Sequence, residues 1–237
     1  MSVLQETTDR LLASLASIRF SKPVTHVYNP LTYARQAYDT YLDRYGSGRP
    51  EIVLLGMNPG PFGMVQTGVP FGEVEAVKDW LGIELPIAPP DHQHPKRPVL
   101  GFECQRSEVS GRRVWGWAKE RFGSPERFFD RFLVLNYCPL AFVEESGRNR
   151  TPDKLAKAER MPLFEACDEA LRATIAFYNP ACVIGIGAFA ESRALAALEG
   201  LDLRIGRITH PSPANPKANR GWKTCIEQEL ADLGIDI

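Results

Sequence analysis

Short apolar runs alternate with stretches of helical periodicity along most of this chain. The apolar runs occupy residues 52–55, 132–135, 181–186 and 203–208. A helical pattern lies between each run and the next, so the connections suit right-handed crossovers, which join parallel strands. Alternation of this kind is typical of α/β proteins. We therefore predict a three-layer α/β/α fold around a four-stranded parallel central sheet.

Helical segments are expected to cover that sheet. Apolar residues recur at helical spacing over 8–18, and aromatic residues do so over 33–45. The other expected helices cover 73–81, 107–122 with a turn at Gly111, 152–178 with a candidate break at Met161–Pro162, and 188–198. Residues 86–98 are too rich in proline for regular structure. No linker or repeat divides the chain, so we expect one domain over residues 1–237, with residues 1–20 forming a peripheral N-terminal helix.

Composition is that of an ordinary globular protein. The chain has 237 residues, 44% of them hydrophobic, and a formal net charge of −1. Any polyanion must therefore be met by a local patch rather than by the whole surface. No apolar run approaches the roughly 20 residues that span a bilayer, and residues 1–10 are polar rather than signal-like. We expect a cytoplasmic monomer that makes no membrane contact.

The five cysteines and the pair His92 and His94 form no metal-binding pattern. The cysteines are widely spread without a C-x-x-C pair, whereas zinc and iron–sulfur sites place their ligands close together. We interpret them as reduced, mostly buried thiols. His92 and His94 are interpreted as solvated loop residues, because their proline-flanked segment offers no further ligands. No metal and no cofactor is expected.

A loop rich in glycine and proline follows the first apolar run. It extends from Gly56 to Gly72, and its prolines fit neither a helix nor a strand. Gly60 and Gly63 permit close approach of a ligand, while the prolines stiffen the backbone. Asn58 sits just past the strand, where its amide can donate and accept hydrogen bonds. The alternative interpretation is an ordinary proline–glycine turn. The length of the loop and the residues after the other strands count against it.

Polar residues also follow the other predicted strands. Ligands of open parallel sheets bind beyond the carboxyl ends of the strands, so Asn58, Asn136, Gly187 and His210 should share one rim. No carboxylate, serine or cysteine nucleophile accompanies them, which disfavours covalent catalysis. Amides can hold a water or read a planar ligand with a donor beside an acceptor. A pyrimidine edge is such a ligand, and the ring of Phe71 could stack on it.

Two segments resemble a known family. Residues 56–74, GMNPGPFGMVQTGVPFGEV, and residues 210–222, HPSPANPKANRGW, are similar to the signature motifs of the single-strand-selective monofunctional uracil-DNA glycosylases, which belong to the uracil-DNA glycosylase superfamily. The expected elements follow the superfamily's order over about residues 20–235, and a bacterial member is expected. The resemblance implies base excision repair: hydrolysis of the N-glycosidic bond of uracil, and of 5-substituted uracils such as 5-hydroxymethyluracil, in single- and double-stranded DNA without strand scission.

The resemblance also assigns roles to individual residues. Asn58 matches the residue that positions the attacking water, and His210 matches the residue placed against the departing base. Phe71 matches the ring that stacks on the flipped base, and Asn136 the amide that reads its edge. The expected catalytic residues are thus Asn58 and His210, and the others bind substrate.

Met57 and Gly60 complete the base pocket that the resemblance implies. Gly60 stands where uracil-specific relatives carry a tyrosine, which is understood to exclude the methyl group of thymine. A glycine leaves room for an ordered water near C5 of the base. A hydroxymethyl group could replace that water and its hydrogen bonds, whereas a methyl group could not.

The segment after His210 is expected to bind DNA, through Pro213, Asn215, Lys217, Asn219, Arg220 and Gly221. Residues 203–226 contain five basic residues and no acid, which suits contacts with phosphates. A proline-bounded helix within 214–220 would serve as the wedge that unstacks a base. Lys96, Arg97, Arg112 and Arg113 extend this basic set, for which a merely solvated face is the alternative. Such a partner implies the nucleoid of a bacterium or the nucleus of a eukaryote.

Two rival functions remain open at this point. Residues 185–190 match the G-x-G-x-x-A form of a dinucleotide-binding turn. The following strand ends in Ile208-Thr209-His210, without the acid that would hold a ribose, so we predict only a tight strand–helix junction there. A non-catalytic reader of damaged or single-stranded DNA is the other rival, which the intact Asn58 and His210 argue against.

Overall fold

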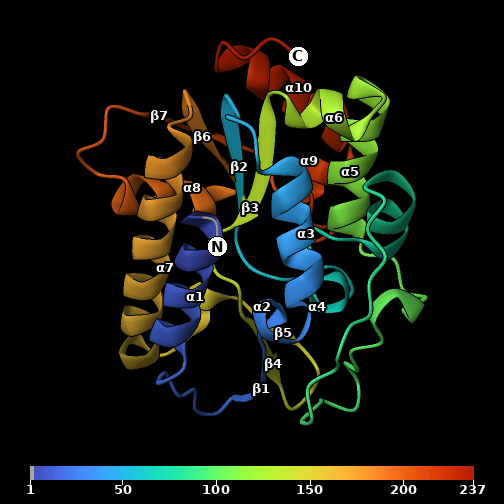
Figure 1. The fold of residues 1–237 in the computed structure, drawn as a ribbon, viewed down its shortest axis with the longest axis vertical. Helices are drawn as coiled ribbons and strands as arrows, with labels where there is room; N and C mark the ends of the chain where they lie inside the picture. Colours follow the sequence, from blue (N-terminus) through green and yellow to red (C-terminus); the bar gives the residue numbers. More distant parts are fainter. Residues whose placement is uncertain (1–2) are drawn as a thin grey trace.

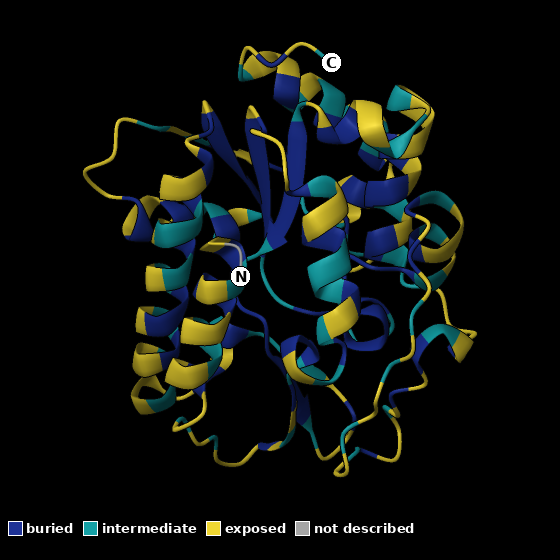
Figure 2. Ribbon diagram, in the orientation of Figure 1, coloured by how far each residue is buried: buried dark blue, intermediate teal, exposed yellow. Residues whose placement is uncertain are grey.

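The four predicted strands form one parallel sheet in the computed structural model, which describes residues 3–237. The strands are β2 (Ile52–Gly56), β3 (Phe132–Asn136), β6 (Cys182–Ile186) and β7 (Arg204–Ile208). Their order in the sheet is β3-β2-β6-β7, with every neighbouring pair parallel. Figure 2 shows β2, β3 and β6 as mostly buried, whereas Arg204 and Arg207 of the edge strand β7 are exposed. The predicted α/β fold with a four-stranded parallel sheet is therefore confirmed.

Helices lie on both sides of this sheet (Figure 1). One group consists of α1 (Val3–Leu15), α7 (Lys157–Tyr178) and α8 (Ala188–Ala197), which pack on one another. The other group contains α3 (Arg35–Tyr45), α5 (Val109–Phe122), α6 (Pro125–Phe129) and α10 (Trp222–Asp232). Aromatic rings fill the second interface, where Trp117 meets Phe128 and Phe132 edge to face. Burial of such large rings is a main source of stability.

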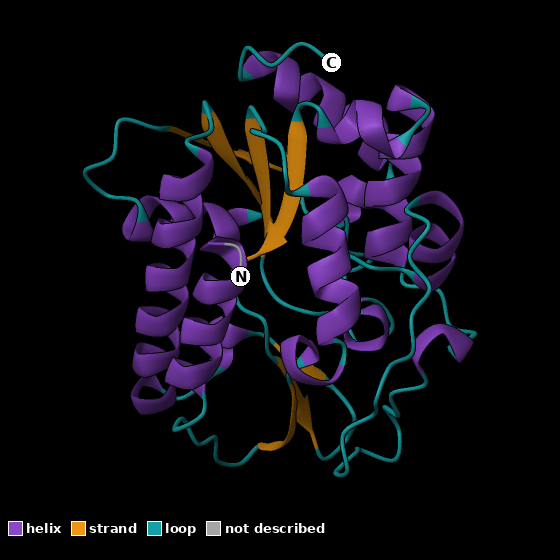
Figure 3. Ribbon diagram, in the orientation of Figure 1, coloured by secondary structure: helices purple, strands orange, loops and turns teal. Residues whose placement is uncertain are grey.

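A second, antiparallel sheet was not predicted. It consists of β1 (Val24–Tyr28), β4 (Ala141–Glu144) and β5 (Asn149–Arg150), in the order β1-β4-β5. The chain passes from β3 into β4 after only four residues. The second sheet therefore lies beyond the carboxyl ends of the parallel strands, as Figure 3 shows. Its position makes it one boundary of any site at that edge.

Several helix boundaries differ from the predictions. Helix α1 begins before residue 8 and ends before residue 18, and residues 1–2 of the expected N-terminal helix lie outside the described residues. The long helix begins at Lys157, after a 3₁₀ turn at Pro152–Lys154, and it continues through Pro162. Proline removes the bond to the carbonyl of Ala158, but that residue is exposed, so water can replace the bond. The predicted break at Met161–Pro162 is therefore wrong.

Gly111 does not form a turn but lies inside α5. A β-carbon at this position would collide with the carbonyl oxygen of Phe71. Glycine thus lets the helix approach the end of the 56–72 loop. The close approach is sealed by Trp115, whose Nε1 donates to the same carbonyl at 3.1 Å.

Short elements complete the fold. They are α2 (Pro30–Tyr33), α4 (Met64–Thr67), a π-helical turn at Ala76–Trp80 within the predicted 73–81 helix, a 3₁₀ turn at Gly101–Glu103 and α9 (Pro216–Asn219). Residues 86–98 contain neither a helix nor a strand, as predicted. No helix among residues 3–237 is long and apolar enough to cross a membrane.

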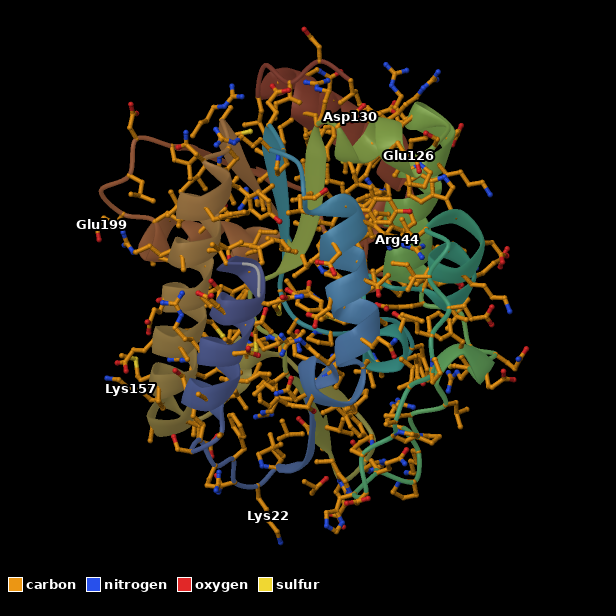
Figure 4. All side chains as sticks on the ribbon, viewed as in Figure 1. Lys22, Arg44, Glu126, Asp130, Lys157 and Glu199 are labelled. Atoms are coloured by element: carbon orange, nitrogen blue, oxygen red, sulfur yellow. The ribbon has the colours of Figure 1, made fainter. Side chains whose placement is uncertain are left out.

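Charged side chains mostly point outward. Those labelled in Figure 4, namely Lys22, Arg44, Glu126, Asp130, Lys157 and Glu199, are all exposed. Glu73 and His94 are exceptions, at 4% and 2% exposure. His94 is therefore not the solvated residue that we predicted: Nε2 lies 3.0 Å from the carbonyl oxygen of Glu145, and Nδ1 accepts from the N–H of Lys96.

The cysteines are free thiols, four of them buried and Cys225 half-buried. The prediction of reduced, mostly buried cysteines is confirmed.

Candidate active site

A cavity of about 360 Å³ opens at the carboxyl edge of the parallel sheet. All six residues predicted to act on the base line it: Met57, Asn58, Gly60, Phe71, Asn136 and His210. The fold joins them because β2, β3 and β7 run parallel and end at one rim. Gly187 packs behind the site, since a β-carbon there would lie 3.1 Å from Cβ of His210. The sequence therefore predicted that these six residues lie together, and they make up half of the residues that line the cavity.

Asn58 is held by the turn after β3. Its Nδ2 donates to the backbone carbonyl of Leu140 at 3.0 Å. This bond assigns the amide orientation and leaves Oδ1 without a hydrogen-bond partner in the described chain, residues 3–237. A carbonyl oxygen at the cavity wall can accept a hydrogen bond from a water and so orient it.

Asn136 and Phe71 both lie over Gly56. A β-carbon at Gly56 would collide with Oδ1 of Asn136 and come within 2.5 Å of the Phe71 ring. Nδ2 of Asn136 donates to the thioether sulfur of Met64 at 3.2 Å, a weak acceptor. Glycine at this position thus brings an amide and an aromatic face to one point in the cavity.

Phe71 adopts a strained backbone conformation. Its φ of 52° lies in the left-handed region that non-glycine residues rarely occupy. The conformation is stabilised because its carbonyl accepts from the N–H of Glu73 as well as from Trp115. Strain of this kind concentrates at functional sites, where it fixes a side chain. Here it directs the ring into the cavity, 6.4 Å between centroids from the imidazole of His210.

His210 is a neutral imidazole with a defined tautomer. Burial lowers its pKa to about 4, so it carries no charge at neutral pH. The backbone N–H of Ser212 donates to Nδ1 at 3.0 Å. The single proton of the ring is therefore on Nε2. His210 can act in this cavity as a hydrogen-bond donor rather than as a cation.

Six further residues line the cavity and were not predicted: Pro61, Glu108, Ser110, Asn149, Thr151 and Ser212. Glu108 corrects the expectation that no carboxylate accompanies the site. Burial, followed by the charge of Glu73, raises the pKa of Glu108 to about 7. Asn149 and Thr151 come from β5 and the residues after it, which belong to the missed second sheet. A single acidic residue before a helix is common in sequences, so nothing in the sequence indicated that Glu108 lines the cavity.

The segment 213–221 lies next to this cavity and is internally braced. Asn215 donates from Nδ2 to the carbonyl of His210, and Asn219 donates to the carbonyl of Pro213. Arg113, on α5, donates to the carbonyl of Pro211 and to Oδ1 of Asn219. Both asparagines therefore shape the segment in this structure, while Pro213, Lys217, Arg220 and Gly221 are exposed. The expected wedge is the short helix α9, with Asn215 as its N-cap.

Most basic residues of the predicted phosphate footprint have protein partners. Lys217 pairs with Glu229, Arg207 with Glu191 and Lys223 with Glu120, and Arg204 donates to the carbonyl of Leu233. The acids come from outside the basic segment, so its sequence did not reveal them. Among residues 203–226, Arg220 is an exposed cation for which the described part of the chain shows no ion pair.

The glycine motif at 185–190 forms a tight strand–helix junction. A β-carbon at Gly185 would collide with the backbone nitrogen of Glu191. Gly187 has a φ of 93°, and its N–H donates to the carbonyl of Ile208. The junction thus packs α8 against β6 and places His210, which confirms the prediction of a packing role.

Comparisons with known proteins agree with this fold. The family model described as Uracil DNA glycosylase superfamily matches residues 44–233. Two similar curated relatives are the single-strand selective monofunctional uracil-DNA glycosylases of Rattus norvegicus, 47% identical, and of Mus musculus, 46% identical. Each alignment covers 95% of this chain and 82% of the relative. The relative from Bos taurus is 46% identical over 95% of this chain and 84% of its own.

A solved structure shows the same fold. The crystal structure of wild-type SMUG2 from Pedobacter heparinus superposes with a TM-score of 0.67 at 18% identity, covering 96% of this chain and 97% of that one. The match to the superfamily model spans most of the chain. The chain therefore belongs to the uracil-DNA glycosylase superfamily and, within it, to the family of single-strand-selective monofunctional uracil-DNA glycosylases.

Proposed function

We propose that this protein is a monofunctional uracil-DNA glycosylase, which hydrolyses the N-glycosidic bond of uracil in DNA and leaves an abasic site. The observation that carries the proposal is the pairing, in one cavity, of a neutral His210 that has its proton on Nε2 with an Asn58 that presents Oδ1. Membership of the family and the names of the relatives support it.

The two residues suit a dissociative reaction. Uracil leaves as a delocalised anion, so the sugar gains oxocarbenium character before water attacks. Nε2–H of His210 donates to the O2 atom of the base, where negative charge develops. A preorganised donor in a site that excludes water is worth far more than one in solution. Asn58 needs only to hold the water, since the cation that it attacks is strongly electrophilic.

Asn136 and Phe71 bind the flipped base. The ring of Phe71 stacks on the base, which contributes ~1–3 kcal/mol in comparable sites. The amide of Asn136 donates to O4 and accepts from N3–H, a pattern that cytosine reverses. The contact between Nδ2 and the sulfur of Met64 supports the orientation of the amide weakly. Full discrimination therefore arises when the base itself completes the hydrogen bonds.

DNA is bound beside the cavity. The segment 213–221 enters the duplex and α9 helps to unstack the target base, at a cost of a few kcal/mol that is smaller in single strands. Arg220 contacts phosphate, since it is exposed and lacks an ion pair within residues 3–237. The protein acts as a monomer on single- and double-stranded DNA. Water, not an amine, attacks the sugar, because no lysine occurs among the described residues that line the cavity.

Excision assays test the proposal directly. The protein is incubated with a uracil-containing oligonucleotide, single- or double-stranded, and alkali then reveals abasic sites. Strand cleavage only after alkali is expected, and borohydride should trap no covalent adduct. Binding without abasic sites would instead identify a non-catalytic reader of DNA, and a trapped adduct would contradict attack by water.

A further inference from the structure

The position of the Glu108 carboxyl group is not explained by helix capping. It precedes α5 at the N-cap position, but its side chain makes no capping bond. The carboxyl group lies instead against the 56–72 loop. A β-carbon at Gly60 would lie 2.6 Å from its carboxyl carbon, and one at Gly63 would lie 2.8 Å from it. The two glycines therefore make room for this group.

One oxygen of this carboxyl group is buried without a protein partner. Oε2 is fully buried and has no hydrogen bond within the described chain, residues 3–237. No ion pair to Glu108 is found there either, and the guanidinium of Arg106 lies over the ring of Phe62 instead. Buried polar atoms are almost always hydrogen-bonded, so one without a partner that lines a cavity points to a ligand.

The position of the other side chains tells which part of a pyrimidine Glu108 would face. With the proposed function, Asn136 holds N3 and O4, and His210 holds O2. C5 is then directed away from these groups. Gly60 and Glu108 line the same cavity next to each other, and neither is used by the contacts to the other edge of the base.

We propose that the carboxyl group of Glu108 reads the substituent at C5 of the base and favours a hydroxymethyl group over a methyl group. This inference rests on the proposed function. A neutral carboxyl group offers one O–H donor and an acceptor oxygen, and a hydroxymethyl group can satisfy both. With plain uracil a water takes that place. A methyl group displaces the water and leaves the carboxyl group without partners.

The surroundings keep the group neutral near pH 7. Burial and the charge of Glu73 raise the pKa of Glu108 to about 7. Ionisable groups on the adjoining elements are Glu73, Arg106, Arg112 and the neutral His210. Loop residues 57–72 contain no ionisable side chain. Above pH 7 the group becomes a carboxylate, which can only accept hydrogen bonds and which repels the departing uracil anion.

Two substitutions separate the hydrogen bonds from the volume. Glu108→Gln keeps a donor and an acceptor, whereas Glu108→Leu keeps only the approximate size. Glu103→Gln serves as the control, because Glu103 is an exposed acid on the preceding turn. The assay measures kcat/KM on otherwise identical oligonucleotides that contain uracil, 5-hydroxymethyluracil or thymine. Thermal melting of each variant checks that it is folded.

The quantity of interest is the ratio of 5-hydroxymethyluracil to uracil activity. We expect it to fall about tenfold in Glu108→Leu and by less than about threefold in Glu108→Gln. In the unmodified protein the ratio should fall as the pH rises above 7, while in Glu108→Gln it should not change with pH. The control should match the unmodified protein at every pH.

The outcomes also distinguish this inference from the proposed function. An unchanged ratio in Glu108→Leu, with uracil still excised, would overturn the role of Glu108 and leave the glycosylase intact. Absence of uracil excision by the unmodified protein would overturn both. If Glu108→Leu does not fold, the pH dependence of the unmodified protein against Glu108→Gln decides, and identical profiles would refute the inference.

Discussion

Two sets of polar side chains meet in the cavity and differ in how the protein uses their atoms. Asn58 and His210 form the oriented set, in which a backbone group fixes each side chain. Glu108 and Asn149 form the unpartnered set, because Oε2 of Glu108 and Oδ1 of Asn149 are buried without hydrogen bonds in the described chain. In the proposed mechanism the oriented set acts on the reaction itself, while Glu108 in the unpartnered set contacts the base. The comparison therefore predicts which substitutions lower the rate and which change the preference among bases.

The oriented set should show the largest effects. Asn58→Ala and His210→Ala should each lower the excision rate by about 10²–10³-fold, as removal of one preorganised hydrogen-bonding group does elsewhere. DNA affinity should change little, because both residues act in the transition state. Single-turnover rates and binding measured by fluorescence anisotropy separate the two quantities. The control is His92→Ala, at an exposed histidine. A wild-type excision rate in Asn58→Ala or His210→Ala would contradict the role assigned to the substituted residue.

Gly60→Tyr tests the unpartnered set, because the tyrosine would displace the carboxyl group of Glu108. Its β-carbon would collide with the carboxyl group of Glu108, so the ring must displace that group and fill the space near C5. Activity on 5-hydroxymethyluracil should be abolished, and uracil activity reduced. The double variant Gly60→Tyr/Glu108→Ala removes the collision and should recover uracil activity. Full hydroxymethyluracil activity in the single variant would show that Gly60 does not face C5.

Asn136 is intermediate between the two sets, since only a thioether sulfur holds its amide. Asn136→Asp replaces the donor to O4 by an acceptor, so uracil excision should fall by about 10–100-fold, the cost of an unpaired polar group. Cytosine, whose N4 amino group donates, should become a better substrate relative to uracil. Comparison of kcat/KM on the two bases measures this shift. Unchanged uracil excision by the variant would refute the contact.

Local patterns in the sequence predicted part of the structure, whereas contacts between residues far apart in the chain could not be predicted. The parallel sheet and its rim could be predicted because apolar runs and helical periodicity are local signals. Gly111 was misread as a turn, since its purpose is an approach to Phe71 about forty residues away in sequence. Strands β1, β4 and β5 are short and pair over long distances, which leaves no clear local pattern.

Glu108 was missed for a related reason. An acid just before a helix is ordinary in sequence, because acids favour helix N-termini. Only the fold shows that its side chain turns toward Gly60 and Gly63, more than forty residues earlier in the chain. The ion pairs of the basic segment were missed in the same way, since the acids that pair with Lys217 and Lys223 lie on other elements. In each of these cases the side chain contacts residues on another element, which the sequence around it does not reveal.

The unpartnered carboxyl group should also affect stability with a defined pH dependence. The pKa of Glu108 is raised from 4.5 to about 7 on folding. Between these values the folded state keeps a proton that the unfolded state has released, so the free energy of unfolding falls as pH rises. Glu108→Gln lacks this loss. Its stability relative to the unmodified protein should therefore increase from pH 5 to pH 7 and then level off, as denaturant unfolding can measure.

A flat difference across that range would mean that Glu108 is not held neutral by the fold. Burial of His210 acts in the opposite direction, because its pKa is lowered to about 4 and the unfolded state takes up a proton below pH 6.5. Both proteins contain that histidine, so its contribution cancels in the difference. Glu103→Gln, which changes an exposed acid outside the cavity, is the matched control.

The smallest effect is expected outside the cavity, where Arg220 and Lys217 repeat the contrast between free and partnered groups. Arg220 makes no ion pair with residues 3–237, whereas Nζ of Lys217 lies 2.6 Å from Oε1 of Glu229. A phosphate that binds Arg220 gains a free cation, while one that binds Lys217 must compete with the carboxylate. Arg220→Ala should therefore reduce DNA affinity equally for all sequences and lower the slope of log K against log salt by about 1. Lys217→Ala should change the slope less, and equal slopes for the two variants would show that the ion pair with Glu229 opens when DNA binds.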